Sequence, residues 1–271
     1  MKDKLCVIIP IHKSTLSPTE KISLEACSNL LNRLNCYLVY PEHITPMEHL
    51  TMFPGLIPMP LSSLYFKSVQ DYNRLKVDIN FYKKFDGFQY LLTYELDAYI
   101  FSNEFESINV FDYDYTGAPF FEGYADATTE SLFIQGGNSG FSMRNIQACI
   151  QGLTVLSKYR KKWKLQFFFI RKLPFFKSIL KKVNWRYYEL FINDHFIGYM
   201  RGGYFNEDVL LSRLLPIIYP SFKVANPLQA MRFSFEVNPE KLLEMNNNDL
   251  PLGCHAWPRY TKFWSKYINS M

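Results

Sequence analysis

The chain has 271 residues, of which 48% are hydrophobic. That is ample for one large core and close to the length at which chains divide, so we expect a single domain over residues 1–271 with appendages. The apolar run at residues 5–11 is too short for a membrane span and lacks a small-residue cleavage site. We therefore expect a cytoplasmic protein.

Five cysteines are scattered along the chain without CxxC spacing. Their odd number and their spacing exclude a disulfide framework and a zinc knuckle. Ordinary reduced thiols are the expectation.

The formal net charge of +5 is unevenly distributed. Residues 131–188 contain no acidic side chain, and residues 158–186 hold eleven Lys and Arg. Removing these eleven from the 30 Lys and Arg leaves 19 against 25 Asp and Glu, a net charge of −6. The basic character therefore belongs to one segment.

The first half of the chain alternates short apolar runs with amphipathic stretches, which indicates an α/β domain. Residues 5–11 read as a buried strand, residues 19–34 have helical apolar spacing, and CYLVYP from Cys36 reads as a second strand. Residues 69–85 again look helical. A further strand is expected to end near Tyr94, and another lies in YDYTGAP from Tyr113.

Two carboxylates, Glu95 and Asp97, follow the strand predicted to end at Tyr94. Open α/β sheets place ligands at the carboxyl ends of strands. Carboxylates there can hold Mg²⁺ or Mn²⁺ against a diphosphate, although an acidic pair in a loop is more often solvated surface.

A second acidic pair, Glu207 and Asp208, follows a Gly-Gly turn at an expected helix start. Such a carboxylate can act as a general base. Acids also favour the first turn of a helix for capping reasons, so local sequence leaves both roles open.

His255 lies in the motif GCHAW, where a glycine allows close backbone approach and a neutral imidazole can complete a metal site. A lone histidine is more often structural. The motif QGGNSGFSMR from Gln135 reads as a glycine-rich loop leading into a helix, with Asn138, Ser139 and Gly140 available to a sugar. Its spacing matches neither a P-loop nor a dinucleotide fingerprint.

Six motifs occur in order: YNRLKVDINFYKKFDGFQYLLTYELDAYIF, YDYTGAPF, GGNSGFSMRN, NEDVLLSRL, AMRFSFE and LPLGCHAW. Together they resemble a bacterial family of GT-A glycosyltransferases grouped as a domain of unknown function, over about residues 72–257. The resemblance implies a GT-A-like nucleotide-diphospho-sugar transferase fold, in which helices flank one mixed central sheet. It also implies a basic helical insertion at residues 151–188.

The resemblance implies roles for single residues. Asp97, Glu95 and His255 stand where such enzymes bind a divalent metal, Mn²⁺ or Mg²⁺. Asp208, with Glu207, resembles the acidic pair beside the acceptor, and Asp208 is the preferred base of an inverting reaction. The implied donor-binding residues are Pro10, His12, Lys13, Arg74, Glu95, Asp97, Asn138, Ser139 and Gly140. Arg74 can instead form an ion pair on a helix surface.

The implied activity is a hexosyltransferase-like transfer from a nucleotide-sugar donor, most commonly a UDP-sugar, to a glycan or lipid-linked acceptor in cell-surface polysaccharide synthesis. Two alternatives stay open. A catalytically silent carbohydrate-binding protein would also be rich in aromatic residues, which make up 17% of this chain. A metal-dependent nucleotidyltransferase or hydrolase could use the same two carboxylates.

The cations of residues 158–186 are interleaved with aromatic residues, a mixture that suits an anionic membrane surface at the inner face of the cell membrane. A solvated helix face is the second interpretation. Nucleic acid is not expected, because the rest of the chain is acidic and carries no nucleic-acid-binding motif.

Overall fold

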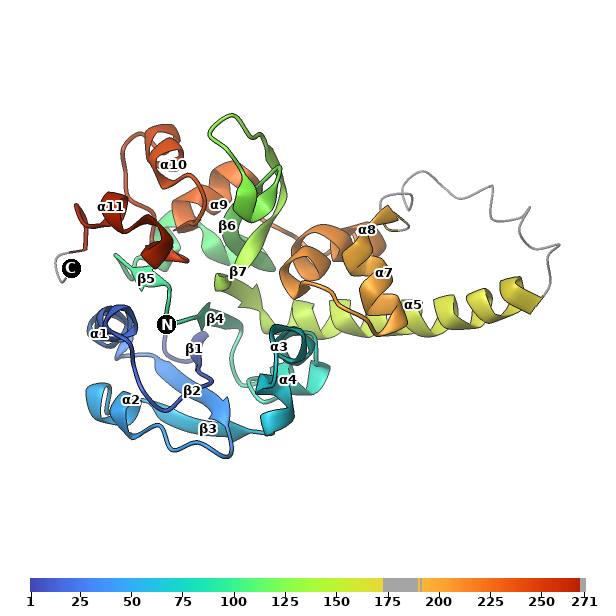
Figure 1. Ribbon diagram of the computed structural model, residues 1–271, viewed down its shortest axis with the longest axis horizontal. Coiled ribbons are helices and arrows are strands. Elements are labelled where there is room, and N and C mark those ends of the chain that lie inside the picture. Colours follow the sequence, from blue (N-terminus) through green and yellow to red (C-terminus); the bar gives the residue numbers. More distant parts are fainter. Residues whose placement is uncertain (173–189, 191, 269–271) are drawn as a thin grey trace.

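The computed structural model describes residues 1–172, 190 and 192–268. Its main sheet contains β1 (Leu5–Pro10), β2 (Asn35–Pro41), β3 (Ile57–Leu61), β4 (Tyr90–Tyr94), β6 (Tyr115–Phe121) and β7 (Phe133–Asn145). The strand order is β3-β2-β1-β4-β7-β6 (Figure 1). Strands β3, β2, β1 and β4 are parallel, whereas β7 is antiparallel to both β4 and β6. The predicted mixed central sheet flanked by helices is confirmed.

The α-helices are α1 (Pro18–Leu31), α2 (Met47–Met52), α3 (Val69–Lys76), α4 (Ile79–Lys83), α5 (Ile146–Lys172), α7 (Asp194–Arg201), α8 (Leu215–Ile218), α9 (Pro227–Phe233), α10 (Pro239–Met245) and α11 (Thr261–Trp264). A π-helical turn, η8 (Val209–Leu214), precedes α8. Short 3-10 turns cover Ser63–Phe66, Phe105–Ile108, Val110–Asp112, Tyr124–Asp126 and Trp257–Tyr260.

Strand β1 explains why the sheet has a core on each face. Side chains alternate along a strand, so Val7 and Ile9 join the core beneath α1, whereas Cys6 and Ile8 join the core beneath α5. Because both faces are covered, the strand sequence is apolar throughout. All five cysteines are buried free thiols, as expected.

The stretch predicted as one helix over residues 69–85 consists of two helices, α3 and α4. The break has a local cause, since the Asp78 carboxylate accepts a hydrogen bond from the Asn80 amide at 2.9 Å and caps α4. Acidic capping residues can start a new helix inside an otherwise continuous helical pattern.

The glycine-rich motif from Gln135 was predicted to form a loop, but in the structure it is part of β7. A Cβ at Gly117 of β6 would lie 1.8 Å from the Asn138 carbonyl oxygen. The two strands therefore approach each other more closely here than side chains permit, and the pairing register shifts after Gly117. Glycine marks close backbone approach rather than a loop at this position.

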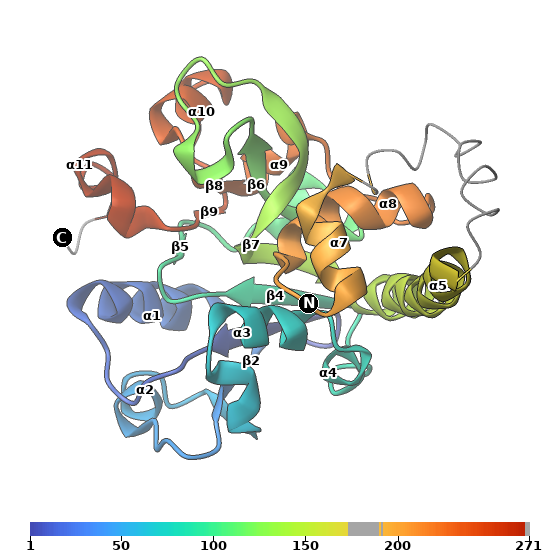
Figure 2. The same ribbon diagram turned by 45° about the vertical axis from the view of Figure 1, so that its right-hand side comes forward.

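A second, three-stranded sheet contains β5 (Tyr99–Ile100), β8 (Ser234–Phe235) and β9 (Gly253–Cys254) in the order β5-β9-β8 (Figure 2). Strand β5 starts just after Asp97, and β9 ends just before His255. This small sheet therefore joins two segments that lie far apart in the sequence.

The expected basic insertion, residues 151–188, begins inside the 27-residue helix α5. Leu153 and Leu156 of this helix are buried in the core, whereas its later turns extend beyond the body of the molecule (Figure 1). The part of the predicted insertion beyond Lys172 lies outside the described residues. None of the helices in the described part of the chain is both long and apolar enough to cross a membrane.

Candidate functional site

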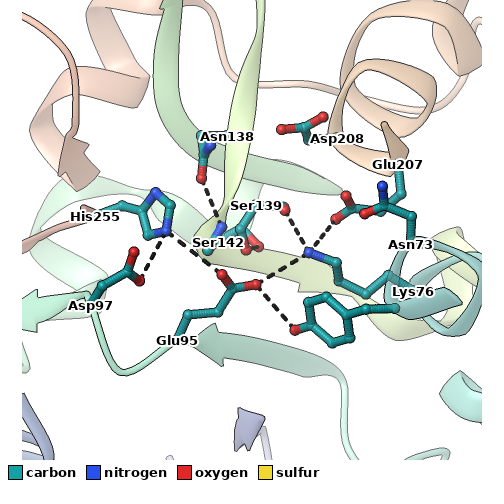
Figure 3. A network of polar contacts seen from close by, with 12 residues as sticks. Asn73, Lys76, Glu95, Asp97, Asn138, Ser139, Ser142, Glu207, Asp208 and His255 are labelled. Carbon is teal, nitrogen blue, oxygen red and sulfur yellow. Dashed lines mark hydrogen bonds and ion pairs between the residues drawn. The ribbon is translucent and has the colours of Figure 1, made fainter. Parts of the chain in front are cut away.

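The small sheet brings Asp97 and His255 together. Tyr99 of β5 pairs with Cys254 of β9, and the Trp257 amide donates to the Asp97 carbonyl at 3.1 Å. As a result, His255 Nε2 lies 3.2 Å from Asp97 Oδ1 and 3.7 Å from Glu95 Oε2 (Figure 3). One ligand atom from each of the three residues lies within 4.8 Å of the others.

Gly140 makes room for this arrangement. A Cβ at this position would lie 2.0 Å from His255 Nε2, so only glycine, which has no Cβ, fits here. The Gly140 carbonyl also accepts a hydrogen bond from the Glu95 amide at 2.8 Å, so β7 holds the Glu95 backbone beside the imidazole. Gly140, which the sequence predicted to bind the donor, therefore lies beside the His255 imidazole and outside the lining of the pocket described below.

The three side chains fit a divalent cation. His255 is buried, and its Nε2 has no hydrogen-bond partner among the described residues, although the two carboxylates are near. Burial lowers the pKa of His255, but Asp97 and Glu236 outweigh it and raise that pKa well above the usual value. The cluster thus favours positive charge at Nε2. Two carboxylates and an imidazole are donors that Mn²⁺ or Mg²⁺ can use.

The buried ammonium group of Lys76 holds the Glu95 carboxylate in place. Lys76 Nζ donates to Glu95 Oε1 at 3.2 Å and to Ser139 Oγ at 2.9 Å, and its side chain is only 5% exposed (Figure 3). Tyr72, one helical turn earlier on α3, donates to the same Glu95 oxygen at 3.1 Å. Although burial raises the pKa of Glu95, Lys76 and His255 hold it well below its usual range. Glu95 is therefore a fixed carboxylate.

Glu207 belongs to the same network rather than to an open site. Its side chain is 2% exposed and accepts from Lys76 at 3.0 Å and from Arg144 at 3.1 Å. Burial raises the pKa of Glu207, but Lys76 and Arg144 outweigh it and lower that pKa. The structure gives this residue an internal ion pair in place of the predicted contact with reacting atoms.

Asp208 has a different environment. It is partly exposed and caps η8 by accepting from the Val209 amide at 2.7 Å. Burial, followed by the negative charge of Glu207, raises the pKa of Asp208 to about 7. A carboxyl group with such a pKa can take up or release a proton at neutral pH.

A pocket of about 500 Å³ opens beside the cluster. Pro10, the last residue of β1, and His12 and Lys13, which follow it, line the pocket together with Glu95 and Asp97. Five of the predicted donor-binding residues therefore share one pocket. Its volume lies in the range of small-ligand sites.

Asn138 and Ser139 lie outside the lining of this pocket. Ser139 is 5% exposed and accepts from Lys76, and Asn138 Oδ1 accepts from the Gly140 amide at 2.8 Å. Their hydrogen bonds stabilise β7 and the buried network. The structure therefore gives both residues an internal role where the sequence predicted direct sugar contacts.

Arg74 lies on the exposed side of α3, where its guanidinium pairs with Asp71 at 2.8 Å. Its side chain is 50% exposed and does not line the pocket. The alternative of a helix-surface ion pair is the arrangement that the structure shows.

Sequence reasoning missed four contributors: Tyr72, Lys76, His49 and Glu236. Tyr72 and Lys76 are spaced i, i+4 and so share one face of α3, but nothing in the spacing identifies their partner. His49 lines the pocket, and its Nδ1 has no hydrogen-bond partner in the described part of the chain. Glu236 is the last residue of AMRFSFE, one of the six motifs that carry the family resemblance. Its place in that motif is the one feature of the sequence that could have identified it as a site residue.

Three glycosyltransferase structures are similar to this chain. The apo form of GlyE from Streptococcus pneumoniae TIGR4 is 12% identical with a TM-score of 0.42, and the match covers 93% of this chain but 54% of that one. This chain thus spans about half the length of that protein. A glycosyltransferase involved in glycosylation of the major capsid of PBCV-1 is 14% identical, with a TM-score of 0.41 and 93% of each chain covered.

The galactosyltransferase LgtC, in complex with donor and acceptor sugar analogues, is 12% identical with a TM-score of 0.47, and the match covers 96% of this chain and 95% of that one. At these TM-scores the likenesses do not bear on the roles of the residues described above. Among curated proteins, no match is found.

One family model matches residues 58–255, which is most of the chain. The matched part includes Glu95, Asp97, Asp208, Glu236 and His255, and it ends at His255. It excludes Pro10, His12 and Lys13, which line the pocket. The chain belongs to the family described as Protein of unknown function (DUF5672).

Proposed function

We propose that the protein is a metal-dependent GT-A glycosyltransferase that moves a sugar from a nucleotide-diphosphate donor, a UDP-sugar, to an acceptor hydroxyl. The observation that carries this proposal is the cluster of Glu95, Asp97 and His255 at the carboxyl end of β4, two of whose residues, Glu95 and Asp97, line a pocket of about 500 Å³. The motif order of the sequence supports the same assignment.

The pocket is proposed to receive the nucleotide. Lys13 and His12, beyond β1, offer donors to phosphate or ribose oxygens, and the buried His49 offers an unpaired ring nitrogen. Burial lowers the pKa of His49, so its imidazole is neutral at pH 7 and suits a polar but uncharged ligand group. The diphosphate would then lie toward Glu95 and Asp97.

When bound by Glu95, Asp97 and His255, Mn²⁺ or Mg²⁺ would neutralise negative charge on the donor diphosphate. The chain's own residues prepare that site, since Lys76 and Tyr72 fix the orientation of Glu95 before any ligand arrives. Catalytic groups held in this way require no reorganisation during the reaction.

Asp208 is proposed as the general base of an inverting transfer. It would accept the proton of the acceptor hydroxyl while that oxygen forms a bond to the anomeric carbon and the bond from that carbon to the diphosphate breaks. The raised pKa, about 7, supports this role because a base works best when its pKa is near the working pH. Glu207 would raise the basicity of Asp208 through its charge.

The proposed acceptor is a glycan or lipid-linked sugar of cell-surface polysaccharide synthesis. Four exposed lysines lie along one stretch of α5, namely Lys158, Lys161, Lys162 and Lys164. We propose that this stretch contacts an anionic membrane at its cytoplasmic face, because basic side chains interact with acidic headgroups. Such contact would bring the active site to lipid-linked substrates.

The test is to incubate the protein and Mn²⁺ with a panel of nucleotide sugars and a mixture of glycan acceptors, and to measure release of nucleoside diphosphate. Acceptor-dependent release from one donor, lost in Asp97→Ala, is the expected result. Release without any acceptor would favour a hydrolase, and binding of sugar without release from any donor would favour a carbohydrate-binding protein.

A further inference from the structure

Glu236 lies next to the metal-site histidine without belonging to the ligand cluster. Phe235 of β8 pairs in parallel with Cys254 of β9, so the residues that directly follow the two strands, Glu236 and His255, come side by side. The His255 amide donates to the Phe235 carbonyl at 2.8 Å, which fixes the two backbones. Glu236 is 9% exposed.

The side chains of Glu236 and His255 also form a hydrogen bond. His255 Nδ1 lies 3.2 Å from Glu236 Oε1. An ionised carboxylate only accepts hydrogen bonds, so Nδ1 carries the hydrogen and donates it. When a cation takes the place of the Nε2 proton, the lone pair of the imidazole is then at Nε2, on the side of Asp97 and Glu95.

Asn138 holds Glu236 in this position. Its Nδ2 donates to the same Glu236 oxygen at 3.2 Å, and its Oδ1 accepts from the Gly140 amide. Asn138 therefore connects the carboxylate that orients the imidazole to the glycine that makes room for it. Strand β7 and the residues directly after β8 and β9 each contribute one part of this arrangement.

We propose that Glu236 is a positioning residue that makes His255 Nε2 a metal ligand by fixing the tautomer and the ring orientation. Histidine ligands commonly donate their second ring N–H to a carboxylate, and loss of that partner weakens metal binding by about 10- to 100-fold. The inference rests on the metal site of the proposed function and extends it to a residue outside the ligand set.

Mn²⁺ binding to the purified chain tests the inference without any sugar or nucleotide. The dissociation constant would be measured by calorimetry, and the ¹⁴N modulation of the Mn²⁺ electron spin echo would report imidazole coordination. We expect Glu236→Ala to raise the dissociation constant about 10- to 100-fold and to lose the ¹⁴N modulation. Glu236→Gln, which keeps an oxygen acceptor, should lose less affinity and keep the nitrogen signal.

The exposed Glu240 provides the matched control, because Glu240→Gln removes the same charge away from His255 and should leave Mn²⁺ binding unchanged. Should Glu236→Ala fail to fold, Glu236→Gln still supplies the comparison. The inference would be overturned if wild type and Glu236→Gln had equal affinity for Mn²⁺ and an equal nitrogen signal, and if any folded Glu236→Ala bound Mn²⁺ unchanged. That outcome would leave the metal-dependent function standing. Absence of Mn²⁺ binding in the wild type would overturn both it and the metal-dependent function.

Discussion

Gly140 determines how closely the imidazole of His255 can approach β7. A Cβ at this position would meet Nε2 at 2.0 Å, and contacts shorter than about 3 Å force something to move. The atom that must move is the one that faces Asp97 and Glu95. A single methyl group at this position should therefore act on the metal site more than on the core.

Gly140→Ala is predicted to weaken Mn²⁺ binding at least tenfold, because the imidazole must rotate away from the two carboxylates. Calorimetric titration with Mn²⁺ measures the effect. Gly87→Ala is the matched control, since a Cβ at Gly87 meets nothing within 4 Å. Equal affinities in the two variants would show that His255 does not bind the cation.

Asp208 gives the proposed activity a pH dependence. A general base must be ionised, so activity should rise about tenfold per pH unit below a pKa of about 7 and level off above it. Asp208→Asn should lower kcat by about 10²- to 10⁴-fold and abolish this limb of the profile. Initial rates between pH 5 and pH 9 measure both, and an unchanged acidic limb in Asp208→Asn would assign it to another group.

Part of the site could be predicted residue by residue. Glu95 and Asp97 follow a recognisable strand, and His255 lies in a motif of its own, so ordered motifs suffice to group them. Lys76 and Glu236 were not predicted, because their roles depend on contacts between segments that no local pattern encodes. A lysine in a helix normally indicates a solvated face, yet this one is 5% exposed.

At the scale of elements, α3 connects the pocket to the buried network. Tyr72 and Lys76, on the same face of this helix, both donate to Glu95, and Lys76 also pairs with Glu207. Removing one partner of a buried ion pair leaves an uncompensated charge and costs about 3–5 kcal/mol. The helix therefore supports both stability and the position of a metal ligand.

Lys76→Met is predicted to lower the free energy of unfolding by about 3 kcal/mol, because Glu95 and Glu207 lose a shared cation inside the protein. Urea denaturation measures the change. Lys84→Met, at an exposed position just after α4, is the control and should change stability by less than about 0.5 kcal/mol. A neutral effect of Lys76→Met would mean that the network contributes nothing to folding.

Elements with a regular apolar pattern were predictable, and those shaped by close backbone contact were not. The apolar run of β1 and the helical spacing of α1 are explicit in the sequence. Strand β7 was mistaken for a loop because its glycines, such as Gly137, serve to let β6 approach, and glycine more often indicates a turn. The two-residue strands β5, β8 and β9 are too short to show any alternation.

At the scale of the whole molecule, charge is separated in space. Without the eleven cations of residues 158–186 the chain carries a net charge of −6, whereas Lys158, Lys161, Lys162 and Lys164 of α5 are exposed, and the last turns of that helix extend away from the body (Figure 1). Such separation lets a protein approach an anionic surface with one end only. The active site and the proposed membrane contact would then work at the same time.

Replacing Lys158, Lys161, Lys162 and Lys164 by Gln is predicted to reduce binding to vesicles of phosphatidylglycerol and phosphatidylcholine at least tenfold, since each lysine near an anionic surface contributes about 1 kcal/mol. Co-sedimentation at low and high salt measures the effect. Nucleotide binding should be unchanged in this variant. Equal vesicle binding by both proteins, or binding that does not weaken with salt, would remove the membrane role from this stretch.

The most direct measurement is thermal stability with a panel of nucleoside diphosphates and nucleotide sugars, with and without Mn²⁺, for the wild type, Asp97→Ala and the exposed control Asp86→Ala. At about 100 times the dissociation constant, a ligand stabilises the folded state by about 2.7 kcal/mol, which corresponds to roughly 5 °C for a chain of this size. We predict a Mn²⁺-dependent rise with one nucleotide, kept in Asp86→Ala and lost in Asp97→Ala. No rise with any nucleotide in the presence of Mn²⁺ would contradict a nucleotide-sugar site.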